Sequence, residues 1–90
     1  MKGTYPIAVF EDRYSGVYSG GSWIAVSECD KIEDGRSRFW IAFDGTHGGG
    51  DIEASSFGDL IPILPWIAVG SSPDEAIENL RKKIWLESRK

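Results

Sequence analysis

The residues of this chain that could carry out chemistry are a set of carboxylates, one histidine and one cysteine. Paired carboxylates can hold divalent cations that activate water against a phosphodiester, as in two-metal nucleases. The carboxylates available for such a site are Asp12, Asp44, Asp51, Glu53 and Asp59. Their spacing forms no metal-binding motif, so we interpret them as solvated surface acids. A weak metal-dependent nuclease is kept as a third hypothesis.

The single histidine and the single cysteine do not suggest a metal site or a catalytic nucleophile. A zinc site takes three or four ligands, and His47 with Cys29 supplies too few of them. We therefore interpret His47 as a turn residue on a solvated loop. Cys29 lies between Glu28 and Asp30, and neighbouring carboxylates disfavour the reactive thiolate. The sequence therefore predicts no catalytic residue, no metal and no cofactor, and the chain is not expected to be an enzyme.

Glycine is dense in two segments, 15–22 and 44–50. The backbone N–H groups of glycine-rich loops can cradle an anion. No Walker lysine follows 15–22 and no helix is expected to begin there, so we interpret it as a flexible loop. If the two segments converge in space, they could instead line a pocket that binds or sequesters a nucleotide-like small molecule. The residues of this alternative ligand site are Ser19, Gly20, Gly21, Thr46, His47 and Gly48.

The composition indicates one small globular domain with an acidic surface. The 90 residues are 41% hydrophobic and 27% charged, and the net charge is -4. Residues 1–60 hold ten acids and five bases, whereas residues 61–90 hold four acids and five bases. This balance argues against nucleic-acid binding, which needs clustered lysine and arginine. It favours a basic protein partner instead.

The cellular setting is constrained by what the sequence lacks. One cysteine excludes an intrachain disulfide. No apolar run approaches the ~20 residues of a membrane span, and no signal-peptide apolar stretch is visible. We therefore expect a cytoplasmic protein without membrane association.

The hydrophobic pattern predicts strands at 5–10, 23–27 and 38–43, where apolar, aromatic and β-branched residues dominate. Asp34-Gly35 is a hairpin turn signal, so the second and third of these strands are expected to pair. Between 44 and 59 the pattern is irregular, and 52–57 reads as a short strand or one helical turn. Two prolines interrupt 60–65, which predicts an extended connector, and a short final strand follows at 66–69.

A helix is predicted from 73 to about 87. Ser72 supplies an N-cap, Pro73 suits the first helical position, and Glu75 completes a capping box. The helix has one apolar face, made by Ala76, Ile77, Leu80 and Ile84. We interpret the basic run at 81–83 as complementing the helix dipole. The fold class predicted for residues 1–90 is α+β, with an antiparallel three- to four-stranded sheet packed on one C-terminal helix and its other face left free.

Two segments of the chain, residues 5–12 and 67–80, carry a resemblance to a known family. Tyr5-Pro6-Ile7-Ala8-Val9-Phe10-Glu11-Asp12 is similar to the opening strand of HicB-type antitoxins. Residues 67–80 are similar to its later strand, its Gly-polar-Thr/Ser-Pro-Glu-Glu-Ala turn and its amphipathic helix. The resemblance implies a partial RNase H-like β-β-β-α unit, interrupted here by an insertion over about 44–65. It also implies neutralisation of a small basic RNA-cleaving toxin and self-association.

The leading hypothesis is a non-enzymatic protein-binding inhibitor that occludes a toxin nuclease or a host defence protein, encoded by a bacterium, a phage or a mobile element. Acids would meet the partner's basic surface and aromatic residues would anchor it. A homo-oligomer is expected. The predicted partner-binding residues are Glu11, Asp12, Tyr14, Tyr18, Glu28, Asp30, Trp40, Asp44 and Asp51.

Overall fold

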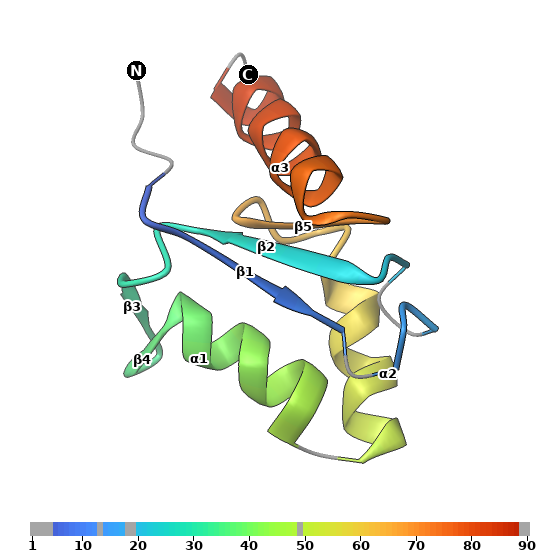
Figure 1. Ribbon diagram of the computed structural model, residues 1–90. Helices are drawn as coiled ribbons and strands as arrows, with labels where there is room; N and C mark the ends of the chain where they lie inside the picture. Colours follow the sequence, from blue (N-terminus) through green and yellow to red (C-terminus); the bar gives the residue numbers. More distant parts are fainter. Residues whose placement is uncertain (1–4, 13, 18–19, 49, 89–90) are drawn as a thin grey trace.

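The computed structural model describes residues 5–12, 14–17, 20–48 and 50–88 and has an α+β architecture (Figure 1). Three antiparallel strands form the main sheet in the order β1-β2-β5: β1 (Ile7–Glu11), β2 (Trp23–Ser27) and β5 (Ile67–Gly70). Two short strands, β3 (Ile32–Glu33) and β4 (Arg36–Ser37), form a separate hairpin. The helical elements are α1 (Arg38–Phe43), the π-helical turn η1 (Asp44–Gly48), α2 (Asp51–Leu60) and α3 (Pro73–Ser88).

The C-terminal helix forms where the sequence predicts it, with the predicted caps. The Ser72 hydroxyl accepts a hydrogen bond from the Glu75 backbone N–H at 3.1 Å. The Glu75 carboxylate reaches back to the N–H of Ser71 at 2.6 Å, one residue earlier than in a standard capping box. Together with the Ser71 hydroxyl, this bond holds the pKa of the Glu75 carboxyl below its usual range.

Helix α3 covers one face of the sheet, as predicted (Figure 1). Ala76 and Leu80 of the helix are fully buried against Ala25 and Ala68 of the strands. Small residues on the strands allow the helix to approach the sheet closely. Gly70 shows how close this approach is, because a Cβ built there would lie 2.4 Å from the backbone nitrogen of Ala76.

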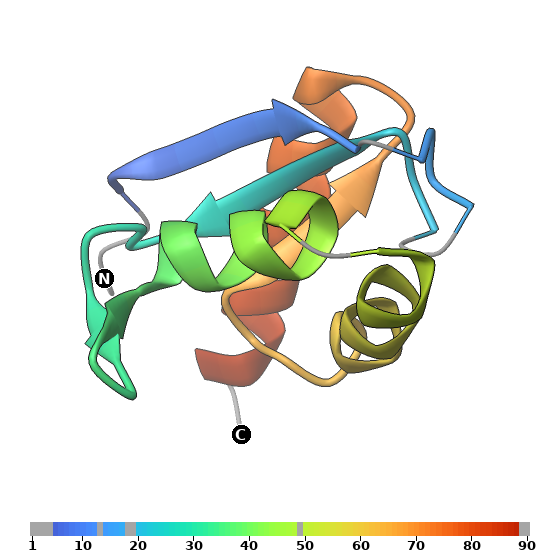
Figure 2. The ribbon, with the colours of Figure 1, turned by 90° about the horizontal axis from the view of Figure 1, so that it is seen from below.

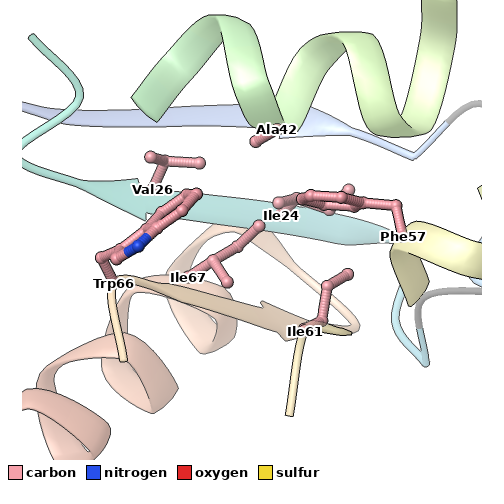
Figure 3. Packing of buried hydrophobic residues seen from close by; sticks show 7 residues of the cluster. All are labelled: Ile24, Val26, Ala42, Phe57, Ile61, Trp66 and Ile67. Carbon is pink, nitrogen blue, oxygen red and sulfur yellow. The ribbon is translucent and has the colours of Figure 1, made fainter. Parts of the chain in front are cut away.

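The second face of the sheet is also covered, so the prediction of a free face is wrong. Helices α1 and α2 lie beneath it (Figures 1 and 2). Ala42 of α1 and Phe57 of α2 meet Ile24 of β2 and Ile67 of β5 in the larger hydrophobic cluster. Figure 3 shows these side chains converging with the Trp66 indole between the sheet and the two helices. The molecule therefore has three layers, with helices on both sides of a small sheet.

The prediction of a strand at 38–43 is wrong, because this segment is helix α1. Ser37 caps it by accepting a hydrogen bond from the Trp40 N–H at 3.3 Å. Helical spacing stacks the rings of Phe39 and Phe43, which are four residues apart, and turns Ala42 into the core. Aromatic residues favour strands only when they pack on a pleated surface. Here the packing of one helix face outweighs that preference.

The remaining differences follow from this change. Asp34-Gly35 does form a tight turn, with φ of 53° and 82°, but it joins β3 to β4. The segment 44–50, expected to be irregular, includes the π-helical turn at 44–48. Residues 52–57 belong to helix α2, and the expected connector at 60–65 begins with the end of that helix and a turn. Because 38–43 is a helix, the third strand of the main sheet is β5, at 67–70.

Candidate functional site

Five ring side chains gather where α1 and η1 meet β1, and we call them the α1 aromatic surface: Phe10, Phe39, Trp40, Phe43 and His47. Phe39 stacks on Phe43 with ring centroids 5.6 Å apart, and Phe43 stacks on His47 at 4.6 Å. Phe10 meets three of the rings edge-on at 5.6–5.9 Å. Trp40 has 53% of its surface exposed, whereas the other four side chains are half-buried. The surface therefore presents an exposed indole on a rigid aromatic base.

The turn η1 stabilises the α1 aromatic surface through hydrogen bonds to α1 and packing against α2. The Thr46 hydroxyl is buried and donates to the carbonyl of Ala42 at 2.9 Å. The same oxygen lies 2.8 Å from Nδ1 of His47. Gly45 packs against α2, since a Cβ there would lie 2.4 Å from the Phe57 ring. The interpretation of His47 as a turn residue on a solvated loop is therefore wrong, because its ring belongs to a packed stack.

Arg38, at the start of α1, joins this region to the β3–β4 hairpin. Its guanidinium forms ion pairs with Glu33 and, at 3.3 Å, with Glu28. It also lies 5.3 Å from the centre of the Trp66 ring, which permits a cation–π contact. A hydrogen bond from Lys31 and the charge of Arg38 hold the pKa of the Glu28 carboxyl below its usual range. Arg38 was not singled out from the sequence.

Three of the acids predicted to meet a partner have partners within the chain. Glu28 pairs with Lys31 and Arg38, as described, and Asp44 pairs with Arg36 at 2.9 Å. Asp12 is buried, and its carboxylate accepts a hydrogen bond from the N–H of Gly16 at 2.6 Å. Because Asp12 is buried and hydrogen-bonded within the chain, it is not part of the exposed acidic surface.

The other predicted partner-binding residues are spread over the molecule. Glu11 and Asp30 are exposed, and no ion pair to either is present among the described residues. Tyr14 is half-buried and Asp51 is the first residue of α2. Tyr18 lies outside the described residues. The geometry thus brings Trp40 and Asp44 together, one helical turn apart, and does not gather the whole set.

The described residues of the glycine-rich segment 15–22 pack against the β5–α3 junction. A Cβ on Gly16 would lie 2.8 Å from the backbone of Gly21, and one on Gly21 would lie 2.8 Å from the backbone nitrogen of Gly70. These contacts require glycine for close backbone approach, which explains the composition without a ligand.

An open hollow of about 500 Å³ lies beside this segment. Its described lining comes from residues 15–16 and 20–22 and from the β5–α3 junction, including Glu75 and Asn79. The described residues 44–48 do not contribute, so Gly20 and Gly21 line the hollow while Thr46 and His47 pack near α1. Gly48 ends η1, and Ser19 lies outside the described residues. The two glycine-rich segments therefore do not form one pocket in the described part of the chain.

Metal-binding geometry is also missing from the described residues. Across 5–12, 14–17, 20–48 and 50–88, no three side chains of histidine, cysteine, aspartate or glutamate lie close enough to hold an ion together. None of the helices described here has the length and apolarity to cross a membrane.

Comparison with protein-family models, with curated proteins and with solved structures gives no match for this chain. The likeness to HicB-type antitoxins therefore stands on the two segments described above, 5–12 and 67–80.

Proposed function

We propose that this chain is a non-enzymatic protein-binding inhibitor, of the antitoxin or the phage and mobile-element anti-defence type, that occludes a basic surface of its partner. The observation that carries this proposal is the exposed Trp40 on the α1 aromatic surface. Tryptophan is enriched among the residues that dominate binding energy at protein interfaces. A side chain of this size, left half exposed on a short and well-anchored helix, is suited to insertion into a partner.

The local geometry supports an anchor that is already ordered before binding. Trp40 contacts Phe39 at 5.2 Å and Phe43 at 5.9 Å between ring centroids. These contacts restrict the indole, so that little side-chain entropy is lost when a partner covers it. Asp44 lies one turn further on the same side of the helical segment and is exposed, but its carboxylate is paired with Arg36 at 2.9 Å. The preference for a basic protein over a nucleic acid is therefore supported by the net charge of -4 rather than by Asp44.

The order of elements supports the antitoxin form of the proposal. The three strands of the main sheet and α3 follow one another as β-β-β-α, with the intervening helices inserted between β2 and β5. This is the order that the resemblance to HicB-type antitoxins implies. The chain between β2 and β5 then supplies four of the five rings of the α1 aromatic surface, and Phe10 of β1 supplies the fifth. This surface would be the part of the molecule specific to this chain's partner.

The test compares Trp40→Ala with Trp85→Ala in capture from host lysate, read by quantitative mass spectrometry. Trp85 is a matched control, because it is 58% exposed and lies on α3 at the opposite face of the sheet. We expect the wild-type protein and Trp85→Ala to retain one basic protein that Trp40→Ala loses by tenfold or more, as expected for about 2 kcal/mol. Equal recovery by both variants would refute the assignment of the binding surface.

The charge component of the proposal is tested on the same captured complex. Exposed acids such as Glu11 and Asp30 would attract a basic partner over distances that salt screens. Raising the ionic strength from about 0.05 M to about 0.5 M should weaken binding severalfold, mainly by slowing association. Affinity that does not change with salt would contradict a basic partner while leaving Trp40 as an anchor.

A further inference from the structure

An ion pair between Arg36 and Asp44 spans the outer side of α1, on which Trp40 is exposed. Arg36 belongs to β4, which continues directly into α1 (Figure 1), and Asp44 is the C-cap of that helix. The guanidinium and the carboxylate are 2.9 Å apart, so the pair extends over the length of the helix. The two side chains are 53% and 50% exposed, and Trp40 is 53% exposed. A protein that covers the indole therefore meets both charges as well.

Helical geometry explains why these side chains share one face. Ala42 points into the hydrophobic core between the sheet and α1. Trp40 and Asp44 lie two residues before and two residues after Ala42, and two residues turn an α-helix by more than half of a full circle. Both side chains therefore leave the helix on the side away from the sheet. Trp40 and Asp44 are also four residues apart, which makes them neighbours on that side.

The order of the two charges is the reverse of the one that stabilises a helix. The positive end of the helix dipole is at the N-terminus, so an acid there and a base further along is the favourable order. Arg36 directly precedes the N-cap Ser37, α1 has no acid in its first turn, and Asp44 lies at its C-terminal end. Helix α3, by contrast, has Asp74 and Glu75 in its first turn. The unfavourable order thus occurs beside Trp40.

The stability of the folded chain does not account for this order. An exposed ion pair contributes little to stability, because solvent screens it and two long side chains lose freedom. Arg38 has a structural reason to lie at the start of α1, since Glu28, Glu33 and the Trp66 ring all contact its guanidinium. Among the residues that the structure describes, Arg36 forms an ion pair with Asp44 alone. Departures from local preference that bring no stability are typical of functional sites.

We infer that the Arg36–Asp44 pair determines which partner the Trp40 site accepts: a pocket for the indole that has a carboxylate facing Arg36 and a cation facing Asp44. This inference rests on the proposed function and names the charges that the partner must place around its pocket. Two opposite charges separated along α1 also fix the orientation of the partner. A reversed approach would bring like charges together across the interface.

The same pair rejects surfaces that carry a single sign of charge. A uniformly basic surface would be attracted by Asp44 but would place a cation against Arg36. The phosphates of a nucleic acid would meet Arg36 but would be repelled by Asp44. Specificity commonly depends on such repulsion of the wrong partner as much as on attraction of the right one. The partner surface is therefore basic overall, with one acid beside the pocket.

The test reverses the pair without removing it. Arg36→Asp combined with Asp44→Arg keeps two opposite charges across α1 and inverts their order, whereas Arg36→Gln combined with Asp44→Asn removes both charges. The ligand is the purified protein whose capture depends on Trp40, and dissociation constants are measured by calorimetry. We expect the neutral variant to bind about threefold to tenfold more weakly than wild type, and the reversed variant more than about a hundredfold more weakly.

The outcomes separate this inference from the proposed function. If the reversed variant binds as well as the neutral variant or better, the inference is overturned and Trp40 remains the anchor. If no captured protein depends on Trp40, the proposed function fails and the inference falls with it.

A second measurement needs no partner. The reversed variant should unfold at the same urea concentration as wild type or at a higher one, because it has the order of charges that a helix favours. A reversed variant that is less stable than wild type, or that does not fold, would show that the native order serves the fold. That result would overturn the inference, whatever the chain binds.

Discussion

Replacing Lys83 by methionine is the sharpest test of how the three layers are held together. The Lys83 ammonium donates to the carbonyl of Ile61 and to that of Ile67, both at 2.7 Å. Ile61 is the C-cap of α2, where carbonyls lack intrahelical partners and a positive charge is favourable. One side chain of α3 therefore bridges the end of α2 and the edge of β5.

The size of the effect follows from these two bonds. A hydrogen bond from a charged group contributes about 1.5–3 kcal/mol, and a buried carbonyl left without its donor is costly. Methionine keeps the aliphatic stem of lysine, so the loss is confined to the ammonium. We expect Lys83→Met to lower the free energy of unfolding by about 2–4 kcal/mol. For a domain of this size, that corresponds to a fall in Tm on the order of 10–30 °C.

The assay is urea unfolding followed by tryptophan fluorescence, which reports on the buried Trp66. Lys82→Met is the matched control, since Lys82 is the adjacent residue of the same helix and is exposed. Its substitution should change the free energy of unfolding by no more than about 0.5 kcal/mol. If the two variants unfold at the same urea concentration, Lys83 does not tie the layers together and the argument fails.

Two further predictions concern close packing and pH. Gly70→Ala should destabilise the fold by about 1–3 kcal/mol in the same urea assay, because the new methyl group would meet rigid backbone of α3; wild-type stability in this variant would mean that α3 can move away from β5. Glu28 has a lowered pKa in the folded chain, so it contributes stability above its usual pKa of 4.5, and that stability is lost as the pH falls through the lowered value. Wild type should therefore lose more stability than Glu28→Gln between about pH 5 and pH 3. Parallel stability curves for the two proteins over that range would rule out a stabilising role for the Lys31 and Arg38 contacts.

The parts of the fold that sequence reasoning predicted are those with local signals. The N-terminus of α3 was predicted from Ser72, Pro73 and Glu75, because capping residues interact within one helical turn. The strand predicted at 23–27 has these bounds, and the strand predicted at 66–69 lies at 67–70. Both are short apolar runs bounded by turn residues. The Asp34-Gly35 turn was found, although its strands were placed too far apart. Each of these features depends on residues close together in the sequence.

Helix α1 was missed because its apolar residues read equally well as a strand. A period of four was nevertheless present in Phe39, Phe43 and His47, whose rings stack in the structure. The spacing of rings was therefore a better signal than the β-preference of each residue. The cover on the second face of the sheet was missed for the same reason, since it depends on α1 and α2 being helices.

The candidate site was predicted in part. Trp40 and Asp44 were singled out as partner-binding residues, but their proximity depends on helical geometry that was not expected. The burial of Asp12 and the ion pairs of Arg38 depend on contacts between separate elements, which no local pattern reveals. Whether Trp40 contacts a partner stays a prediction for the capture experiment.

The position of β5 in the sheet also shapes how the chain acquires its structure. Its neighbour β2 ends at Ser27 and β5 begins at Ile67, so their ladder closes a long loop that holds every element from β3 to α2. The β1–β2 ladder and the β5–α3 contact, by contrast, join elements that are consecutive along the chain or nearly so. Closing the long loop costs entropy before its contacts form. We expect these two local units to assemble early and their union across β2 and β5 to limit the folding rate.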